Sequence, residues 1–395
     1  MSKTEGGPPL RPDTIATHAG RDPQKHFGAV NVPVFHASTI LSPSVAQLQA
    51  PKGRRDPRYG RRGTPTLFSL EDAVADLEGA YGATITPSGL NAIAVAMLAF
   101  LKAGDHALMA DCAYGPARRL SNTLLRRFGV EVTFFDPAIG SGIAELIRDN
   151  TRVVYLEAPG SLTFEMQDVP AIAAAAHARG AMVLMDNTWA TPVFFKPFAH
   201  GVDVSIHAAT KYIVGHSDAM LGVVTTTEAA FEAVRDAADT IGVCAGPDDV
   251  YLATRGIRTM PVRLRQHQAN ALALARWLQA RPEVSRVLYP ALPDDPGHAL
   301  WKRDFTGASG LFGVVLRPAS EAAVAAMLDG LRLFGMGASW GGYESLILPT
   351  DPAPYRTATR WAPEGPTLRI HAGLEDVEDL MADLEAGFER LRAAA

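Results

Sequence analysis

The pattern of hydrophobic and polar residues changes near residue 63. Residues 1–62 are rich in Gly, Pro and Arg and show weak periodicity, which predicts an extended segment without a core of its own. We expect this N-terminal arm to reach a neighbouring subunit, and a floppy tail is the alternative. From Ser69 onward, short apolar runs alternate with segments of helical periodicity.

Apolar runs predict the strands of the region that follows the arm. They are continuous rather than alternating, which is typical of strands buried on both faces. The predicted strands are 83–86, 106–110, 130–135, 153–157, 181–186, 202–207 and 220–226. The helices between them begin at a capping box of Ser69 and Asp72, follow Pro87, or cover 118–127, 143–148 and 170–179. This alternation predicts an α/β fold with a mostly parallel central sheet and helices on both faces.

The last third of the chain predicts a second unit. A long helical region follows Gly246, and the residues beyond it mix strands with helices. The predicted elements there are strands 310–316 and 367–372 and helices 320–331 and 374–391. We therefore expect three parts: the arm at 1–62, a larger domain at 63–257 and a smaller C-terminal α/β domain at 258–395.

Composition excludes several classes of function. The 395 residues are 47% hydrophobic and 20% charged, which is ordinary for a globular protein. A net charge of -5 gives no general affinity for nucleic acid or anionic membranes. The two cysteines, Cys112 and Cys244, indicate neither a disulfide framework nor a metal cluster, and we expect both to be buried. No run is apolar enough for a signal sequence or a membrane span, so we expect a cytoplasmic protein.

One lysine stands out against its surroundings. Lys211 follows the apolar strand 202–207 and precedes the small and polar residues 215–218. A lysine in a desolvated site loses its proton more easily and can attack a carbonyl group. The alternative is a lysine at a strand end that extends its amine to water. This stretch alone does not decide between them.

Other candidate groups fall at the same edge of the predicted sheet, where open parallel sheets bind ligands. Gly89 lies at a helix N-terminus that favours a phosphate, although Ser88 could be an ordinary N-cap. Asp186 closes an apolar strand, where a carboxylate is costly without a partner; it could hold a pyridinium nitrogen protonated, and a helix cap or an internal salt bridge is the alternative. Tyr114 follows strand 106–110 and could stack on an aromatic ring, although in isolation a partly buried surface tyrosine is favoured. With Lys211, these groups match the needs of pyridoxal phosphate: an amine, a partner for the ring nitrogen and anion ligands.

Rival ligands have weaker support in the sequence. No Gly-x-Gly-x-x-Gly follows a strand and no P-loop lysine motif is present, which argues against dinucleotides and nucleoside triphosphates. His207 and His216 could bind a metal, but no third ligand has suitable spacing. We therefore expect structural roles for both histidines and no metal.

Motifs along nearly the whole chain resemble the Cys/Met-metabolism family of pyridoxal-phosphate enzymes. They are Thr17–Gly20, Tyr59–Arg61, Pro87–Leu90, Asp186–Thr188, Ser205–Asp218 and Ser339–Ser345. The resemblance implies fold type I of the pyridoxal-phosphate-dependent transferases, pyridoxal 5'-phosphate as cofactor, and a homotetramer made of two active dimers.

The resemblance also implies roles for individual residues. Lys211 would bind the cofactor covalently and then move protons, with Tyr114 as the second catalytic residue. The implied cofactor-binding residues are Tyr59, Arg61, Gly89, Leu90, Tyr114, Asp186, Thr188, Thr210 and Lys211. Of these, Tyr59 and Arg61 would come from the neighbouring subunit. The implied substrate-binding residues are Tyr59, Tyr114, Ser339, Trp340 and Arg369. Arg369 would clamp the substrate carboxylate, for which its bidentate fork is suited.

Within the family, the chain is most similar to the β-lyase branch. The closer likeness lies in Ala208–Met220, Trp301–Gly307 and Ser339–Trp340. It implies β-elimination on L-cystathionine or related cysteine S-conjugates, giving homocysteine or another thiol, pyruvate and ammonia. A γ-lyase or γ-synthase would use the same cofactor residues and is the alternative enzyme. A non-catalytic cofactor sensor is the alternative from another class, although it would not need this complete set of residues.

Some positions depart from the family pattern. Ala208 stands where many members have serine, so the phosphate site lacks one hydroxyl. Ser161 stands where many have asparagine, and Pro116 lies near Tyr114, where methionine γ-lyases often have cysteine. These differences fit the β-lyase branch better than the γ branches.

Overall fold

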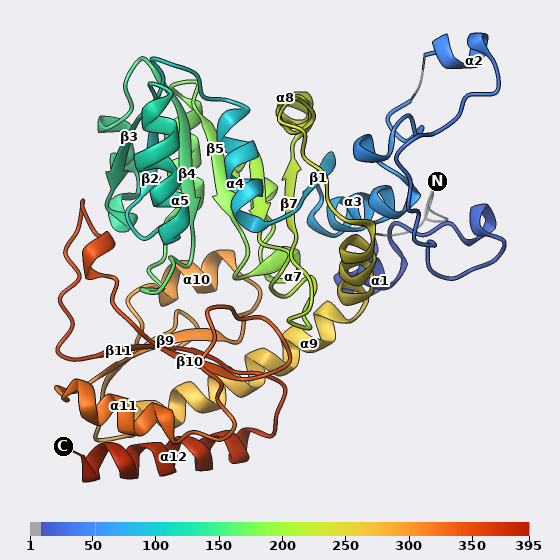
Figure 1. Ribbon diagram of the computed structural model, residues 1–395. Coiled ribbons are helices and arrows are strands. Elements are labelled where there is room, and N and C mark those ends of the chain that lie inside the picture. Colours follow the sequence, from blue (N-terminus) through green and yellow to red (C-terminus); the bar gives the residue numbers. More distant parts are fainter. Residues whose placement is uncertain (1–8, 52, 395) are drawn as a thin grey trace.

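A seven-stranded sheet forms the centre of the larger part of the molecule (Figure 1). The computed structural model describes residues 9–51 and 53–394. The strands are β1 (Gly82–Thr86), β2 (His106–Ala110), β3 (Glu131–Phe135), β4 (Thr151–Glu157), β5 (Met182–Asp186), β6 (Val204–His207) and β7 (Gly222–Thr226). Their order is β1-β7-β6-β5-β4-β2-β3, and β7 pairs antiparallel with both its neighbours while the remaining pairs are parallel.

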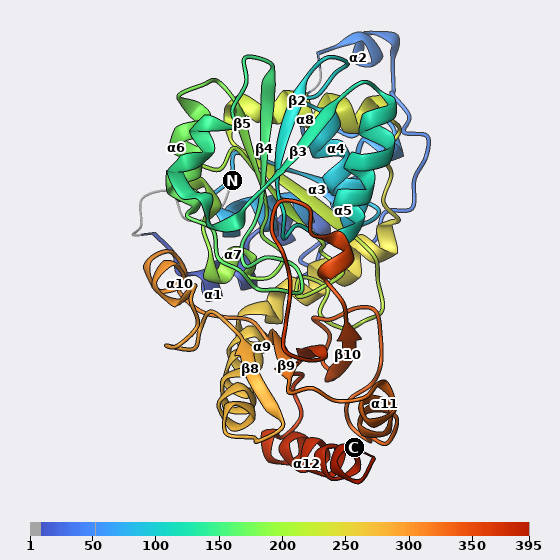
Figure 2. The ribbon, with the colours of Figure 1, turned by 90° about the vertical axis from the view of Figure 1, so that its left-hand side faces the viewer.

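Helices cover both faces of this sheet, as Figure 2 shows. The helices of this part are α1 (Pro12–His18), α2 (Val45–Gln49), α3 (Pro65–Glu78), α4 (Gly89–Leu98), α5 (Gly115–Leu120), α6 (Val169–His177), α7 (Thr191–Phe194) and α8 (Glu228–Thr240). Short segments of 3-10 or π helix cover 23–26, 60–62, 121–125, 137–145 and 197–200. Most strands are buried along their whole length, as continuous apolar runs require. The predicted fold class, a mostly parallel α/β sheet, is confirmed.

A four-stranded antiparallel sheet forms the smaller part. Its strands, in the order β10-β11-β9-β8, are β8 (Val284–Leu288), β9 (Leu311–Leu316), β10 (Leu346–Thr350) and β11 (Thr367–His371). The accompanying helices are α9 (Pro247–Gln279), α10 (His298–Asp304), α11 (Glu321–Asp329) and α12 (Val377–Ala393), with a 3-10 turn at 353–355. Since α9 continues unbroken through residue 258, the domain boundaries stay a proposal.

Two local predictions were wrong. Helix α3 begins at Pro65 after the extended residue Thr64, because proline fits the first helical turn. Ser69 therefore lies inside the helix rather than capping it, and its hydroxyl donates to the carbonyl of Gly20 at 2.6 Å. Cys244 is exposed, whereas Cys112 is buried as expected.

The described part of the arm, residues 9–51 and 53–62, packs on the body at α1, where Ala16 is fully buried, but leaves several large apolar side chains beyond α1 exposed. Figure 1 shows α2 and its flanking loops projecting away from the large sheet. Phe27, Leu41, Val45 and Leu48 are all largely exposed there. Residues 1–8 of the predicted arm lie outside the described residues. No described helix is both long enough and apolar enough to span a membrane.

A buried carboxylate joins the end of α3 to strands β6 and β7 and to the residue after β5. Glu78, at the end of α3, accepts hydrogen bonds from Asn187 and Ser205, each at 2.9 Å, and from Thr225. It also lies 2.8 Å from Nε2 of His207. Burial acts to raise the pKa of Glu78, but His207 and the other donors outweigh it and lower the pKa. His207 is therefore a structural residue, as predicted.

Replacing His207 with leucine should leave the Glu78 carboxylate without its imidazole partner. We expect the free energy of unfolding to fall by about 3 kcal/mol, since an unpaired buried carboxylate is costly. Urea unfolding followed by circular dichroism measures the change. The control is His216→Leu, because His216 is exposed and bonds only locally, to the carbonyl of Val214. Equal unfolding midpoints for the two variants would contradict this role of His207.

Candidate active site

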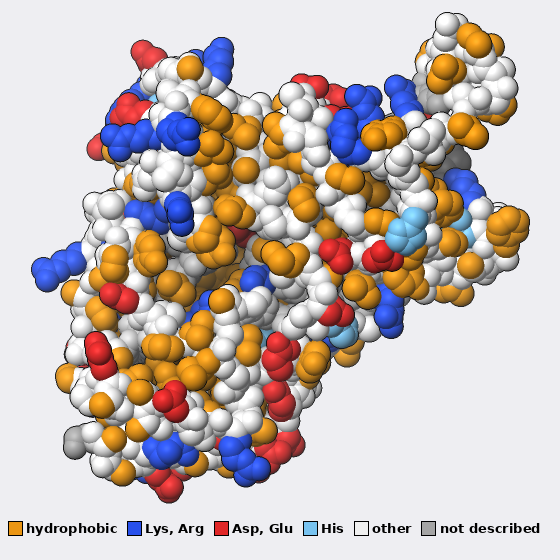
Figure 3. All heavy atoms as spheres, in the orientation of Figure 1, with side chains coloured by type: hydrophobic (Ala, Val, Ile, Leu, Met, Phe, Trp, Pro, Cys, Tyr) orange, Lys and Arg blue, Asp and Glu red, His pale blue; other side chains and the backbone are white. Residues whose placement is uncertain are grey.

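A cavity of about 520 Å³ opens at the carboxyl ends of β1, β2, β4, β5 and β6. Figure 3 shows the surface hollowed between the part that holds the large sheet and the part that holds the small one. Loops after these strands form most of the wall, and β11 of the small sheet contributes Arg369. The cavity thus lies where parallel sheets bind ligands, and both parts of the chain border it.

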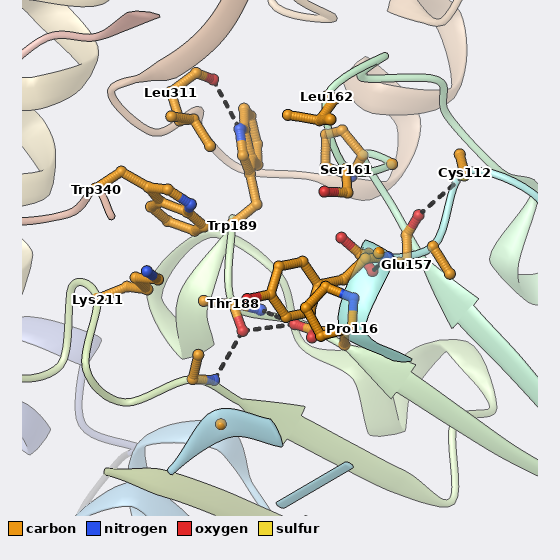
Figure 4. A pocket seen from close by; sticks show the side chains of 18 of the residues that line it. Cys112, Pro116, Glu157, Ser161, Leu162, Thr188, Trp189, Lys211, Leu311 and Trp340 are labelled. Atoms are coloured by element: carbon orange, nitrogen blue, oxygen red, sulfur yellow. Dashed lines mark hydrogen bonds between the residues drawn. The ribbon is translucent and has the colours of Figure 1, made fainter. Parts of the chain in front are cut away.

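Lys211 projects into this cavity from the connection between β6 and β7 (Figure 4). Its amine donates a hydrogen bond to Oγ of Ser339 at 2.7 Å and lies 5.3 Å from the ring centre of Trp340. Burial lowers the pKa of Lys211 to about 8, and the positive charge of Arg369 adds to this effect. The lysine is therefore a desolvated amine that is partly neutral near physiological pH.

Asp186 closes β5 on the floor of the cavity. Its Oδ1 accepts hydrogen bonds from the backbone N–H and the hydroxyl of Thr188, at 2.9 and 2.5 Å. The same hydroxyl accepts from the N–H of Ala208 at 2.9 Å, so it links the ends of β5 and β6. Burial raises the pKa of Asp186. A protonated pyridine nitrogen is the kind of partner that would keep this carboxylate charged.

Glu157 is a further acidic residue that our sequence reasoning did not assign to the site. It ends β4 and lies directly opposite Asp186 in the pairing of β4 with β5. Its Oε2 accepts from the backbone N–H of Tyr114 at 2.7 Å. Burial, together with the charge of Asp186, raises the pKa of Glu157 well above its usual range. The available signal was an acidic residue closing an apolar strand, the same signal that identified Asp186.

The N-terminus of α4 is the place where the sequence predicts an anion site. Ser88 caps the helix by accepting from the N–H of Asn91 at 3.2 Å. The first N–H groups of a helix have no intrahelical acceptors and point outward. A Cβ on Gly89 would lie 2.6 Å from Cβ of Ala208, so glycine is needed for this close approach. The small residue at 208 and the glycine at 89 therefore fit one another.

The hydroxyl of Thr210, which the resemblance implies as a cofactor ligand, is already hydrogen-bonded to the backbone of Leu221. This hydroxyl donates to the carbonyl of Leu221 at 3.1 Å and accepts from the N–H of Leu221 at 3.0 Å. The hydroxyl proton would have to turn away from this carbonyl to bind an anion. Thr210 nevertheless lines the cavity, as do Gly89 and Leu90.

Arg369 and Trp340 form the wall on the side of the small sheet. Arg369 lies in β11, and its Nη2 donates to the carbonyl of Ser339 at 2.9 Å. Burial lowers the pKa of Arg369, and the group stays charged in any physiological range. Tyr114 also lines the cavity, and burial raises the pKa of its phenol.

Two predicted residues lie elsewhere in the chain. Tyr59 and Arg61 are not among the residues that line the cavity. Arg61 instead donates to the carbonyl of Asp239 at 3.0 Å, and Tyr59 is half exposed. A single chain therefore brings together all the predicted site residues except these two.

Comparison with known proteins agrees with this geometry. The family described as Cys/Met metabolism PLP-dependent enzyme matches residues 13–389. The chain belongs to this family. Its predicted cofactor, pyridoxal phosphate, and its nature as an enzyme of amino-acid metabolism are thereby confirmed.

Individual relatives cover nearly the whole chain. The cystathionine β-lyase of Escherichia coli (strain K12) is 46% identical, over 96% of this chain and 98% of the relative. The L-alanine/L-glutamate racemase of Wolbachia pipientis wMel is 41% identical, over 97% of this chain and 98% of the relative. The crystal structure of cystathionine γ-synthase from Xanthomonas oryzae pv. oryzae in complex with cystathionine matches with a TM-score of 0.90 and 32% identity, covering 98% of this chain and all of that one.

The residues around the cavity fit pyridoxal phosphate. A desolvated lysine projects into the cavity, a buried carboxylate on β5 suits a ring nitrogen, and a helix N-terminus suits a phosphate. Figure 4 shows Lys211 and Glu157 on opposite sides of the site, with Thr188 between them. The aromatic ring of Tyr114 supplies a stacking surface.

The lowered pKa of Lys211 can be measured on the enzyme without its cofactor. Only a neutral amine reacts with an acylating reagent, so the rate of labelling at Lys211 should rise with pH through a midpoint of about 8. Mass spectrometry of digested protein follows the labelling. In Arg369→Leu the midpoint should move upward, because a neighbouring positive charge has been removed. A midpoint close to the ordinary lysine value of 10.5 would contradict the desolvated site.

Proposed function

We propose that the protein is a carbon–sulfur lyase that performs β-elimination on L-cystathionine or related cysteine S-conjugates. The observation that supports this most is the convergence of Lys211, Asp186 and Arg369 on one cavity. The likeness to the cystathionine β-lyase of Escherichia coli points to the same reaction. Homocysteine or another thiol, pyruvate and ammonia would be the products.

Each residue has a task in this reaction. When bound, pyridoxal phosphate withdraws electrons from the α-carbon of the substrate. Gly89 and Leu90 would hold its phosphate with backbone N–H groups, Thr188 and Thr210 would support it, and Asp186 would keep its ring nitrogen protonated. Tyr114 would stack on its ring.

The substrate would be oriented by the wall opposite the cofactor. Arg369 would bind the α-carboxylate with two parallel hydrogen bonds. Ser339, which already contacts the amine of Lys211, would fix the position from which that amine acts. Trp340 would shape the space beside it.

Lys211 would remove the proton from Cα in its neutral form, which its lowered pKa makes available. The electrons released at Cα form a double bond to Cβ as the Cβ–S bond breaks and the thiol leaves with a proton. Addition of one water then gives pyruvate and ammonia. Tyr114 lies beside Glu157 and would assist these proton transfers.

The holoenzyme should release pyruvate from L-cystathionine, detected with a coupled dehydrogenase. We expect Lys211→Ala to lower kcat/KM by at least about 10³-fold, because it removes the general base. Arg369→Lys should raise KM about tenfold or more with a smaller effect on kcat, since a point charge replaces the bidentate fork.

Other products from the wild-type enzyme would contradict the proposal. Release of 2-oxobutyrate and cysteine from L-cystathionine would assign a γ-lyase instead. Racemisation of L-alanine without any pyruvate from L-cystathionine would assign the activity named for the Wolbachia relative. His216→Leu serves as the control for general damage, because His216 is exposed.

We further infer that the active form is a dimer or a tetramer of two such dimers, located in the cytoplasm. The exposed apolar side chains of the arm support a second copy as its partner. Tyr59 and Arg61 follow the projecting segment and would reach the cavity of that copy. There they would complete the phosphate site and the substrate site.

Mixing two inactive variants tests whether subunits share the site. Arg61→Ala and Lys211→Ala would damage different sites of a mixed dimer, leaving one site intact. After unfolding and refolding together, the mixture should recover about one quarter of the wild-type activity. The matched control pairs Asp186→Ala with Lys211→Ala, where no mixed dimer has an intact site. Equal activity in the two mixtures would place Arg61 in the site of its own chain, and light scattering gives the oligomer size.

A further inference from the structure

One part of the cavity wall is formed by residues that have no role in the proposed reaction. Residues 351–360, here called the strap, form the first part of the connection between β10 and β11 and include the 3-10 turn at 353–355. In both Figure 1 and Figure 2 this red segment rises from the small sheet to the lower end of the large one. Pro352, Tyr355 and Arg356 of the strap line the cavity.

Asp111, directly after β2, holds the far end of the strap. Its carboxylate is 1% exposed and accepts from the backbone N–H groups of Thr357, Ala358 and Thr359, at 2.9 to 3.2 Å. The hydroxyls of Thr357 and Thr359 donate to it as well, at 3.1 and 2.8 Å. A carboxylate with this many donors from one short segment fixes the path of that segment.

Arg356 ties the strap to a second loop of the large sheet. Its side chain is 4% exposed, and its two terminal nitrogens bond both oxygens of Glu165 at 2.5 and 2.9 Å. Its Nε donates to Asp111 at 3.2 Å, and Nη1 donates to Thr163 at 3.2 Å. The loops after β2 and β4 are thus joined through one arginine of the strap, an arrangement we call the Asp111–Arg356 clasp.

The charged groups of the clasp form ion pairs with one another. Asp111 is also paired with Arg118 at 2.9 Å, so two carboxylates and two guanidinium groups balance one another. The surface that the strap offers to a ligand is therefore mainly the ring of Tyr355, since Pro352, although it lines the cavity, is largely buried. Tyr355 is 53% exposed, and its ring lies 3.8 Å from where a Cβ on Gly115 would be, next to Tyr114.

Tyr355 lies on a part of the wall that neither the cofactor nor the carboxylate is expected to occupy. Pro116, Ser161 and Leu162 also line the cavity, and Figure 4 shows them on the side away from Lys211. Once the α-carbon is placed at Lys211, the group attached to sulfur is the part of the substrate left to fill this space. An exposed aromatic ring suits contact with a thioether chain.

We propose that Tyr355 is a specificity-determining residue, which packs against the group that leaves on sulfur, and that the Asp111–Arg356 clasp holds it in place. This inference rests on the proposed β-elimination and deepens it. The strap selects substrates by the size of the leaving group, whereas Lys211, Asp186 and Arg369 act on the part that all substrates share.

The experiment compares two substrates in the holoenzyme. L-Cystathionine has a long leaving group, and 3-chloro-L-alanine loses only chloride; both give pyruvate on β-elimination. Tyr355→Ala should lower kcat/KM for L-cystathionine about fivefold, the loss expected when an aromatic contact is removed. For 3-chloro-L-alanine, kcat/KM should stay within about twofold of the wild-type value, because that substrate does not reach the strap. Tyr355→Phe should keep the wild-type ratio of the two values.

The clasp is tested with Arg356→Gln, which keeps hydrogen-bonding capacity but removes the charge. In folded protein, verified by circular dichroism, it should reproduce the selective loss seen in Tyr355→Ala. The double variant should show no further loss, since both changes remove one contact. Arg360→Ala is the matched control, because Arg360 is exposed on the strap and does not line the cavity.

The outcomes separate this inference from the proposed function. If the wild-type enzyme releases no pyruvate from either substrate, the proposed function fails and this inference falls with it. If both substrates give pyruvate but Tyr355→Ala leaves their ratio unchanged or favours L-cystathionine, only the role of Tyr355 is overturned. A folded Arg356→Gln variant with wild-type selectivity overturns the role of the clasp.

Discussion

Burial of a single amine is the constraint on which the site depends. A lysine in contact with water holds its proton until far above neutral pH, whereas burial lowers the pKa of Lys211 to about 8. The nearby carboxylate of Asp186 opposes this shift, and the guanidinium of Arg369 reinforces it. The site must therefore keep Arg369 close and Asp186 engaged elsewhere. Thr188 meets the second need by donating two hydrogen bonds to Asp186.

Two acidic side chains end adjacent strands in the same cavity. Glu157 and Asp186 lie opposite each other in the pairing of β4 with β5, and burial raises the pKa of both. Two neighbouring carboxylates cannot both be charged cheaply in a dry site. Bound cofactor would favour charge on Asp186, which leaves Glu157 as the group that takes the proton. Glu157 also accepts a hydrogen bond from the backbone N–H of Tyr114. The protonation state of Glu157 therefore affects how firmly the ring of Tyr114 is held.

Much of the fold could be predicted because the parallel strands are buried on both faces and appear as continuous apolar runs. The strand at 106–110 was predicted with its observed bounds. Strands β8 and β10 were missed, because their mixed burial gives no such run and β10 contains Pro349. The helix start at Pro65 was missed because a serine and an aspartate at suitable spacing imitate a cap. Contacts between segments that are distant in the sequence, such as the hydrogen bond of Ser69 to Gly20, decide where an element begins. The local pattern of residues carries no information about these contacts.

The candidate site could be predicted where residues share the edge of one sheet. Lys211, Asp186 and Gly89 follow strands, so the topology alone brings them together. The strap could not be predicted, because Asp111 and Thr357 are 246 residues apart in the chain and meet only through the packing of the two parts. Tyr59 and Arg61 do not line the cavity of their own chain. Their proposed place in the cavity of a second copy does not follow from the topology of one chain.

The reversed direction of β7 has a consequence for how the reactive lysine is supported. A connection between parallel neighbours must cross the sheet, usually through a helix, and returns far from the edge it left. Because β6 and β7 run in opposite directions side by side, residues 208–221 leave and rejoin the sheet at the same edge. Paired strands therefore hold the loop that bears Lys211 at both of its ends, beside the cavity. The loop is restrained at both ends.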